Sequence, residues 1–164
     1  MVARDLPGVM AVADCVHHAF PEDEAVFAER LRLYPGGCLV FSSGEDILGY
    51  AISHPWRMYD PPALNSQLGE IPREPDTYYI HDVALMPELH GSGAAALVVA
   101  LLLARAQKYL FPTVSLVAVS GSAGFWERHG FRNVASQKVV SATLVRKLRA
   151  YDDAAIFMAR QIRK

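Results

Sequence analysis

The chain has 164 residues, of which 52% are hydrophobic and 20% are charged. This length suits one globular domain with a sizeable core and is short for two. The formal net charge is -1, with acidic and basic residues interleaved, so the composition shows no basic face for nucleic acid or an anionic membrane. We therefore expect one domain over residues 1–164 whose partner is a small molecule or a local protein segment.

Neither export nor membrane insertion is indicated. The first twenty residues lack a basic segment followed by a long apolar stretch, so no secretory signal is expected. The apolar run from Ala94 to Ala104 is about half as long as a membrane span requires, which favours a buried helix. Cys15 and Cys38 lack metal-ligand spacing and fit core thiols of a reduced, cytoplasmic protein without a bound metal.

The N-terminal part predicts two helices and a hairpin. Apolar residues recur at helical spacing over residues 5–19 and 22–34, and acids open the second segment, where the helix dipole favours them. Residues 37–56 place β-branched and aromatic residues on both sides of Ser-Ser-Gly-Glu-Asp, which predicts an antiparallel hairpin. Residues 55–76 contain five prolines and predict a long loop, of a kind that is commonly functional or mobile.

Strands and helices alternate in the rest of the chain. Residues 77–86 predict a strand, residues 88–107 a helix of about five turns with a glycine-containing start, and residues 113–119 a buried strand. This alternation, after the helices and the hairpin, predicts an α/β or α+β domain with a mixed sheet. The remaining predicted elements are a short helix within 121–130, a strand from Phe131, a helix at 143–151 and a strand at 154–162.

The start of the third predicted helix, "HGSGAA" from His90 to Ala95, has the residues of an anion site. A helix start leaves backbone N–H groups without partners, and small side chains let a pyrophosphate approach them. A Walker loop would need a closing Gly-Lys-Ser/Thr, and a dinucleotide fingerprint a third glycine and a downstream acid; neither is present. A tight turn with close helix packing explains Gly91 and Gly93 equally well.

Two motifs follow each other in this region: "TYYIHDVALMPELHGSGAAALVVALLLARA" and, about thirty residues later, "VSLVAVSGSAGFWERHGF". Together they resemble the GNAT superfamily of acetyl-CoA-dependent N-acetyltransferases, in which the central helix begins with Arg/Gln-x-x-Gly-x-Gly/Ala and the second motif closes with a "FYEKLGF" pattern. The resemblance covers roughly residues 37–135. It implies a single GNAT-like domain with a mixed central sheet of about six to seven strands flanked by helices.

The resemblance implies acetyl-CoA as the co-substrate. The strands at 77–86 and 113–119 would splay apart, and the pantetheine arm would lie in the gap. The backbone of Val83 and Leu85 would pair with the arm, with Ala84 adjacent. Ser120 stands where many family members have Asn, and it would either hydrogen-bond the arm or cap a loop.

The same resemblance places the pyrophosphate on the helix start. His90 replaces the Arg or Gln of the family, which weakens the charge contact but leaves the backbone cradle. Trp126 replaces a Tyr that acts as an acid on the thiolate, and an indole cannot usefully give up its proton. Packing against the arm is the role expected for Trp126, with Ser122 or a loop tyrosine as another donor. The cradle residues are Gly91, Ser92, Gly93, Ala94 and Ala95.

Strand alternation orders the candidate catalytic residues. It puts Tyr79, His81, Val83 and Leu85 on one face, and Ile80, Asp82 and Ala84 on the other. His81 would therefore share a face with the residues that meet pantetheine. Acetyl transfer needs a base that leaves the attacking amine neutral, and an imidazole titrates near neutrality.

His81 is the candidate base. It matches a histidine on the corresponding strand of serotonin N-acetyltransferase, which this strand resembles, while Tyr79 is in register with the catalytic Glu of histone acetyltransferases. The alternative is a His81 that packs beside the sheet without a chemical role. Asp82 would orient His81 only through a bulge, and is otherwise structural or faces the substrate.

The proline-rich segment is the candidate acceptor wall. Trp56 and Tyr59, with the acids Asp60, Glu70 and Glu74, would attract a cationic amine with an aromatic or aliphatic body. Tyr79 and Asp82 join them as candidate substrate residues. A metal site built from Cys15, His17 and His18 is disfavoured, because adjacent histidines on a helix point to different faces.

These features predict an N-acetyltransferase that moves the acetyl group of acetyl-CoA directly to a primary amine of a small molecule or protein. A non-catalytic acyl-CoA-binding or sensing module is the alternative, motivated by Trp126 and His90. A nucleotide-binding protein is a third interpretation. The absence of a Walker-loop Lys and of the downstream acid of a dinucleotide fingerprint argues against it. No nucleic acid, membrane or metal partner is expected, and a homodimer is left open.

Overall fold

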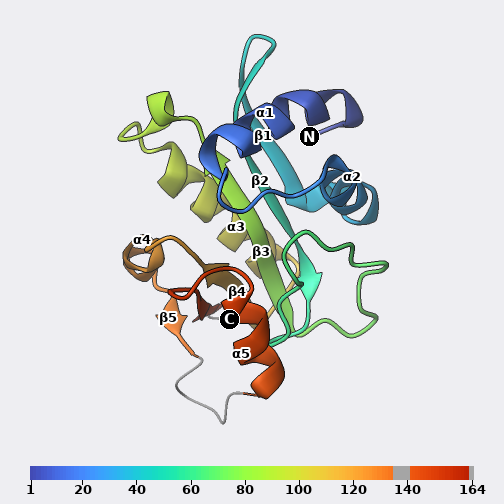
Figure 1. The fold of residues 1–164 in the computed structure, drawn as a ribbon, viewed down its shortest axis with the longest axis vertical. Coiled ribbons are helices and arrows are strands. Elements are labelled where there is room, and N and C mark those ends of the chain that lie inside the picture. Colours follow the sequence, from blue (N-terminus) through green and yellow to red (C-terminus); the bar gives the residue numbers. More distant parts are fainter. Residues whose placement is uncertain (135–140, 163–164) are drawn as a thin grey trace.

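The computed structural model describes residues 1–134 and 141–162. Within them, six strands form one mixed sheet in the order β1-β2-β3-β4-β6-β5 (Figure 1). Only β3 and β4 pair in parallel, and the other neighbours are antiparallel. The strands are β1 (Cys38–Ser43), β2 (Asp46–Trp56), β3 (Thr77–Leu85), β4 (Thr113–Ala118), β5 (Arg132–Asn133) and β6 (Ile156–Gln161).

Helices cover both faces of the sheet. In Figure 1, α1, α2 and α5 lie over the near face, and α3 crosses behind. The fold therefore has the mixed sheet flanked by helices that the sequence predicts. The helices are α1 (Leu6–Val16), α2 (Glu24–Leu33), α3 (Ala94–Lys108), α4 (Ala123–Arg128) and α5 (Ala142–Arg149), with single 3-10 turns at Ala3–Asp5, Pro35–Gly37 and Pro87–Leu89.

Most predicted elements are confirmed, with three differences. The loop predicted over residues 55–76 begins later, because β2 runs through Pro55 to Trp56 and pairs there with β3. The helix α3 has 15 residues, about four turns rather than five, because the chain first forms the 3-10 turn Pro87–Leu89 and a left-handed glycine turn. Of the two expected core thiols, Cys38 is buried but Cys15 is exposed, since it lies on the outer side of α1.

The central parallel strands separate as they run forward. They pair over only three positions, from Tyr78 with Val114 to Ile80 with Leu116. Beyond these pairs β3 continues to Leu85 and β4 to Ala118 without further pairing between them. The predicted splay between the two strands is confirmed, and it opens the sheet at the carboxyl ends of β3 and β4.

A β-bulge interrupts β3 beside the splay. Ile52 of β2 pairs with Asp82, but the next residue, Ser53, pairs with Ile80, so His81 is an extra residue opposite β2. Such a residue leaves the ladder and re-aims the side chains around it. The regular alternation that the sequence predicts for β3 therefore fails at His81.

The proline-rich segment between β2 and β3 is held against α2. A buried ion pair joins Arg30 to Glu29 at 2.7 Å, and the Arg30 side chain also donates to the Ser66 carbonyl at 2.8 Å. Glu29 in turn accepts the backbone N–H groups of Leu68 and Gly69 at 2.6 and 3.0 Å. These buried and partly buried bonds hold residues 66–69 of the segment against α2.

Candidate active site

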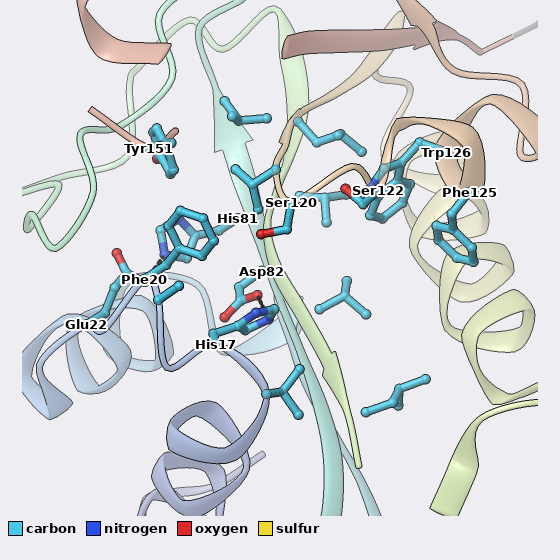
Figure 2. A pocket seen from close by; sticks show the side chains of 18 of the residues that line it. His17, Phe20, Glu22, His81, Asp82, Ser120, Ser122, Phe125, Trp126 and Tyr151 are labelled. Atoms are coloured by element: carbon cyan, nitrogen blue, oxygen red, sulfur yellow. Dashed lines mark hydrogen bonds and ion pairs between the residues drawn. The ribbon is translucent and has the colours of Figure 1, made fainter. Parts of the chain in front are cut away.

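A cavity of about 620 Å³ opens where β3 and β4 separate. Figure 2 shows Glu22, Phe20 and Tyr151 near His81 on one side of it, and Ser122, Phe125 and Trp126 on the other. A pocket of this size is typical of a small-molecule site. The predicted residues that line it are His81, Asp82, Val83, Leu85, His90, Ala95, Ser120 and Trp126.

His81 is held by Glu22, from the loop between α1 and α2. The His81 Nε2 and Glu22 Oε2 atoms are 2.8 Å apart, and the two side chains are only 3% and 7% exposed. A carboxylate only accepts hydrogen bonds, so Nε2 carries the proton in the neutral imidazole and Nδ1 keeps its lone pair. That Nδ1 atom is buried and has no hydrogen-bond partner among the described residues.

Two groups stabilise the charged form of Glu22. Burial by itself disfavours the carboxylate, but the charge and hydrogen bond of His81, together with the Asn65 N–H at 2.9 Å, hold the pKa of Glu22 below its ordinary value. Glu22 therefore stays ionised near neutral pH. An ionised partner on Nε2 orients the ring and stabilises the protonated imidazole that forms when Nδ1 takes a proton.

The bulge changes which side chains share a face with His81. Ile80 and Val83 both pack toward α3, whereas Asp82 and Ala84 lie on the side of α1 and α2. His81 joins Asp82 on that side, where it meets Glu22, so the predicted grouping of His81 with Val83 is wrong. The reason is the extra residue, which puts two consecutive side chains on one face.

Asp82 has partners of its own. Its carboxylate accepts from the Tyr50 hydroxyl at 2.5 Å and pairs with His17 Nε2 at 2.9 Å. Burial opposes the charge, yet the His17 hydrogen bond holds the pKa of Asp82 below its usual value, and Asp82 likewise raises the pKa of His17 against the effect of burial. Although the bulge brings Asp82 beside His81, the residue that bonds the imidazole is Glu22.

The start of α3 forms an open cradle. Gly91 and Gly93 have φ angles of 77° and 88°, in the left-handed region that favours glycine. A Cβ added at either would meet no atom within 4 Å, so close helix packing does not explain these glycines. The Ala94 N–H donates to Ser92 Oγ at 3.2 Å, while the N–H groups of the next residues have no intrahelical carbonyl to bond and stay available to an anion.

Of the other residues predicted to contact the pantetheine arm, two line the cavity and one is buried in the core. Ser120 lines the cavity, and its backbone N–H donates to Asp152 at 2.8 Å. Trp126 packs edge-to-face on Phe131, with ring centroids 5.3 Å apart, and also borders the cavity. The Ala84 side chain, 1% exposed, packs against α1 and α2 and leaves only its backbone for the arm.

The aromatic residues expected to face the acceptor lie elsewhere. Trp56, Tyr59 and Tyr79 pack with Phe157 and the apolar side of α5, and none of the three is among the described residues that line the cavity. The Trp56 indole also donates to the Asp60 carbonyl at 2.6 Å, which turns its polar end back onto its own loop. The acceptor role expected for these side chains has no support in this geometry.

Sequence reasoning missed several residues of the cavity wall. The sequence predicts Glu22 as an acid at the start of a helix, and no local pattern links it to a residue 59 positions later. Phe20 and His17 lie beyond the apolar stripe of α1, and Tyr151 follows α5. No local sequence pattern indicates these residues, because they come together only through contacts between segments distant in the chain.

The described residues contain neither a membrane-spanning helix nor a cluster of metal ligands. No helix within residues 1–134 and 141–162 is long and apolar enough to cross a membrane. Within the same residues, no group of three or more His, Cys, Asp or Glu side chains could hold a metal ion.

Solved structures share this fold. Ard1 from Thermoplasma volcanium has a TM-score of 0.70 at 13% identity, covering 100% of this chain and 95% of that one. The ribosomal-protein-S18-alanine N-acetyltransferase from Escherichia coli has a TM-score of 0.63 at 19% identity, covering 100% and 92%. GphF, a GNAT-like decarboxylase in complex with isobutyryl-CoA, has a TM-score of 0.72 at 15% identity, covering 99% and 97%.

At these identities the similarity shows the fold alone. Comparison with curated proteins gave no significant match. The sequence itself matches the Acetyltransferase (GNAT) family over residues 10–131, which is most of the chain and includes β3, the glycine turn and α4. The protein is therefore a member of the GNAT acetyltransferase family.

Proposed function

We propose that this protein transfers the acetyl group of acetyl-CoA directly to a primary amine. The observation that carries the proposal is the buried His81 Nδ1, which has no partner among the described residues and belongs to a ring held by Glu22. The residue His81 is among those that line a cavity that opens between two splayed strands. A base in this position suits an amine that must lose a proton as it attacks.

The chain's own residues fit acetyl-CoA. The left-handed turn at Gly91 and Gly93 leaves open space where a Cβ would stand, and free amides at the start of α3 suit a pyrophosphate. From Val83 to Leu85, β3 pairs with β2 but has no partner on the β4 side, so the backbone edge that faces the splay is open to a pantetheine arm as it would be to a neighbouring strand. When bound, acetyl-CoA would supply the activated acetyl group.

The proton balance assigns roles to side chains on both sides of the cavity. As the new C–N bond forms and the C–S bond breaks, His81 Nδ1 accepts the proton that the nitrogen loses, and Glu22 stabilises the imidazolium. The departing thiolate needs a proton, which the indole of Trp126 cannot supply. Ser122 and Tyr151 also line the cavity and carry hydroxyl groups, so they are the candidate donors of this proton.

A non-catalytic acyl-CoA-binding module is the second candidate. It is favoured by Trp126, which stands where the family has an acidic Tyr and instead packs on Phe131. The GphF structure, named as a decarboxylase, adds that GNAT-like folds are not limited to amine acetylation.

Two measurements separate these functions. Calorimetric titration with acetyl-CoA tests binding, and release of the CoA thiol in the presence of a panel of amines tests transfer. The proposal predicts both binding and amine-dependent thiol release, with the acetylated amine as the second product. Binding without release for any amine supports the binding module, and release without an amine points to hydrolysis of the thioester.

A further inference from the structure

Three segments that bond to one another enclose the part of the cavity around His81. The Asn65 N–H, from the proline-rich segment, donates to Glu22 at 2.9 Å, and the Tyr151 hydroxyl donates to the Pro62 carbonyl at 2.9 Å. Glu22 and Tyr151 both line the cavity, as does Leu64 between their two partners. The segments before α2, after β2 and after α5 therefore form a joined wall beside the candidate base (Figure 2).

The charged side chains of this wall are carboxylates. Glu22 and Asp82 line both this cavity and a smaller one of about 200 Å³ that shares part of its wall. Among the described residues, no Lys or Arg lines either cavity. The buried Arg30 pairs with Glu29 at 2.7 Å, and although its charge also acts on Glu22, it is not among the residues that line either cavity.

Two of the four histidines that line the cavity are already paired with its carboxylates. His17 pairs with Asp82 at 2.9 Å, so any positive charge on His17 is matched by that carboxylate. His81 is bonded to Glu22, and its remaining Nδ1 atom carries a lone pair that accepts, rather than donates, a hydrogen bond. Around His81 the described lining therefore combines two histidine-paired carboxylates with apolar side chains and has no Lys or Arg.

We propose that the acceptor is a small primary amine with an apolar body and no carboxylate beside the nitrogen. This inference rests on the proposed function and names its substrate class. An α-carboxylate next to the reacting nitrogen would lose its water, find no Lys or Arg, and lie near the charge of Glu22. An alkyl- or arylalkyl-ammonium is instead attracted by the carboxylates, and its body meets Val16, Phe20 and Leu64.

The joined wall favours a small acceptor over an extended peptide. A peptide would need polar partners for its backbone groups and a way out past the bonded segments. A peptide is therefore compared with small amines in the experiment below.

Matched acceptors isolate the carboxylate. Thiol release at saturating acetyl-CoA is measured with 2-phenylethylamine, phenylalanine, phenylalanine amide and a tetrapeptide that begins with phenylalanine. We expect kcat/KM for 2-phenylethylamine to exceed that for phenylalanine by about 100-fold or more. The amide, which keeps the bulk but not the charge, should recover most of the difference. Equal use of phenylalanine, or use of the peptide above every small amine, overturns the inference.

A paired substitution tests the missing cation directly. His18 is exposed and borders both cavities, so a longer basic side chain can be accommodated there. His18→Arg should narrow the ratio between 2-phenylethylamine and phenylalanine by about 10-fold, because the guanidinium pairs with the carboxylate. His18→Gln, which removes the same imidazole without adding charge, should leave the ratio unchanged. A ratio that is the same in both variants counts against the charge argument.

Binding measurements keep this inference separate from the proposed function. The same four acceptors are titrated into the CoA-bound protein by calorimetry. If no amine releases thiol but 2-phenylethylamine binds more tightly than phenylalanine, the proposed function fails and the acceptor class stands. If thiol is released and phenylalanine is preferred in both assays, the acceptor class fails and the function stands.

Discussion

His81 and Glu22 are 59 positions apart in the sequence, and their side chains meet at 2.8 Å in the wall of the cavity. One comes from the bulge of β3 and the other from the loop before α2. The contact directs one imidazole nitrogen to a carboxylate and leaves the other without a described partner. A histidine with one ring nitrogen bonded to a carboxylate and the other free to accept a proton has the arrangement of a general base oriented by an acid.

Replacing His81 tests the base. We expect His81→Ala to lower kcat at neutral pH by about 10²- to 10⁴-fold, the usual range for losing a general base. The affinity for acetyl-CoA should change little, because the cradle and the open edge of β3 remain. Stopped-flow turnover and calorimetry measure the two quantities separately. A variant whose pH–rate profile matches that of the wild type would remove His81 from the mechanism.

Replacing Glu22 tests the positioning of the ring. Glu22→Gln keeps the size of the side chain but removes the carboxylate that accepts the Nε2–H hydrogen bond and orients the ring, so kcat should fall about 10-fold while the affinity for acetyl-CoA stays nearly unchanged. Glu22→Asp should restore part of the rate. Glu29→Gln is the matched control, because Glu29 is also a buried acid but bonds Arg30. It should lower stability without lowering kcat at a temperature where the protein stays folded.

The glycine turn can be tested against a turn of the same geometry. Gly93→Val places a branched side chain where open space lies now, so CoA affinity should fall at least about 10-fold through lost phosphate contacts. Gly44→Val is the control, since Gly44 also has a positive φ, 63°, and open space but lies in the β1–β2 turn. Both variants carry comparable backbone strain. Pantetheine, which lacks the pyrophosphate, should bind Gly93→Val almost normally.

His54 should make the fold acid-sensitive. Burial, with the nearby charge of His81, lowers the pKa of His54 to about 3. Between about pH 6.5 and pH 3 the unfolded chain therefore binds one more proton at this histidine than the folded protein does. Each unit by which the pH falls within that window should lower the free energy of unfolding by about 1.4 kcal/mol. Urea unfolding at pH 6.5 and pH 5 should show a loss of about 2 kcal/mol from His54 that is missing in His54→Phe. An equal pH dependence in the two proteins contradicts this assignment.

The proton donor to the thiolate is open to a paired test. Tyr151 and Ser122 line the cavity from different elements. Burial raises the pKa of the Tyr151 hydroxyl, so it stays protonated through the alkaline range. If Tyr151 is the donor, Tyr151→Phe should lower kcat about 10- to 100-fold and Ser122→Ala should not. Unchanged rates in both variants would mean that water protonates the thiolate.

Much of the fold could be predicted from local sequence patterns. Hydrophobic periodicity, proline positions and the glycine turn gave the order of helices and strands, because each depends on residues close together in the chain. Two neighbouring motifs gave the family and drew attention to His81 on β3. The order of the elements and the family motifs can both be recognised from short segments of the sequence.

The tertiary structure decided what His81 contacts. The bulge at His81 arises because its neighbours Asp82 and Ile80 pair with Ile52 and Ser53 of β2. Its partner Glu22 comes from a distant loop, so no window of sequence contains either relationship. The same packing turned Trp56 and Tyr59 toward the apolar side of α5 and away from the cavity, because burying that apolar surface against the helix removes it from water. Local sequence determined which elements form, whereas contacts between residues distant in the chain determined which side chains reach the cavity.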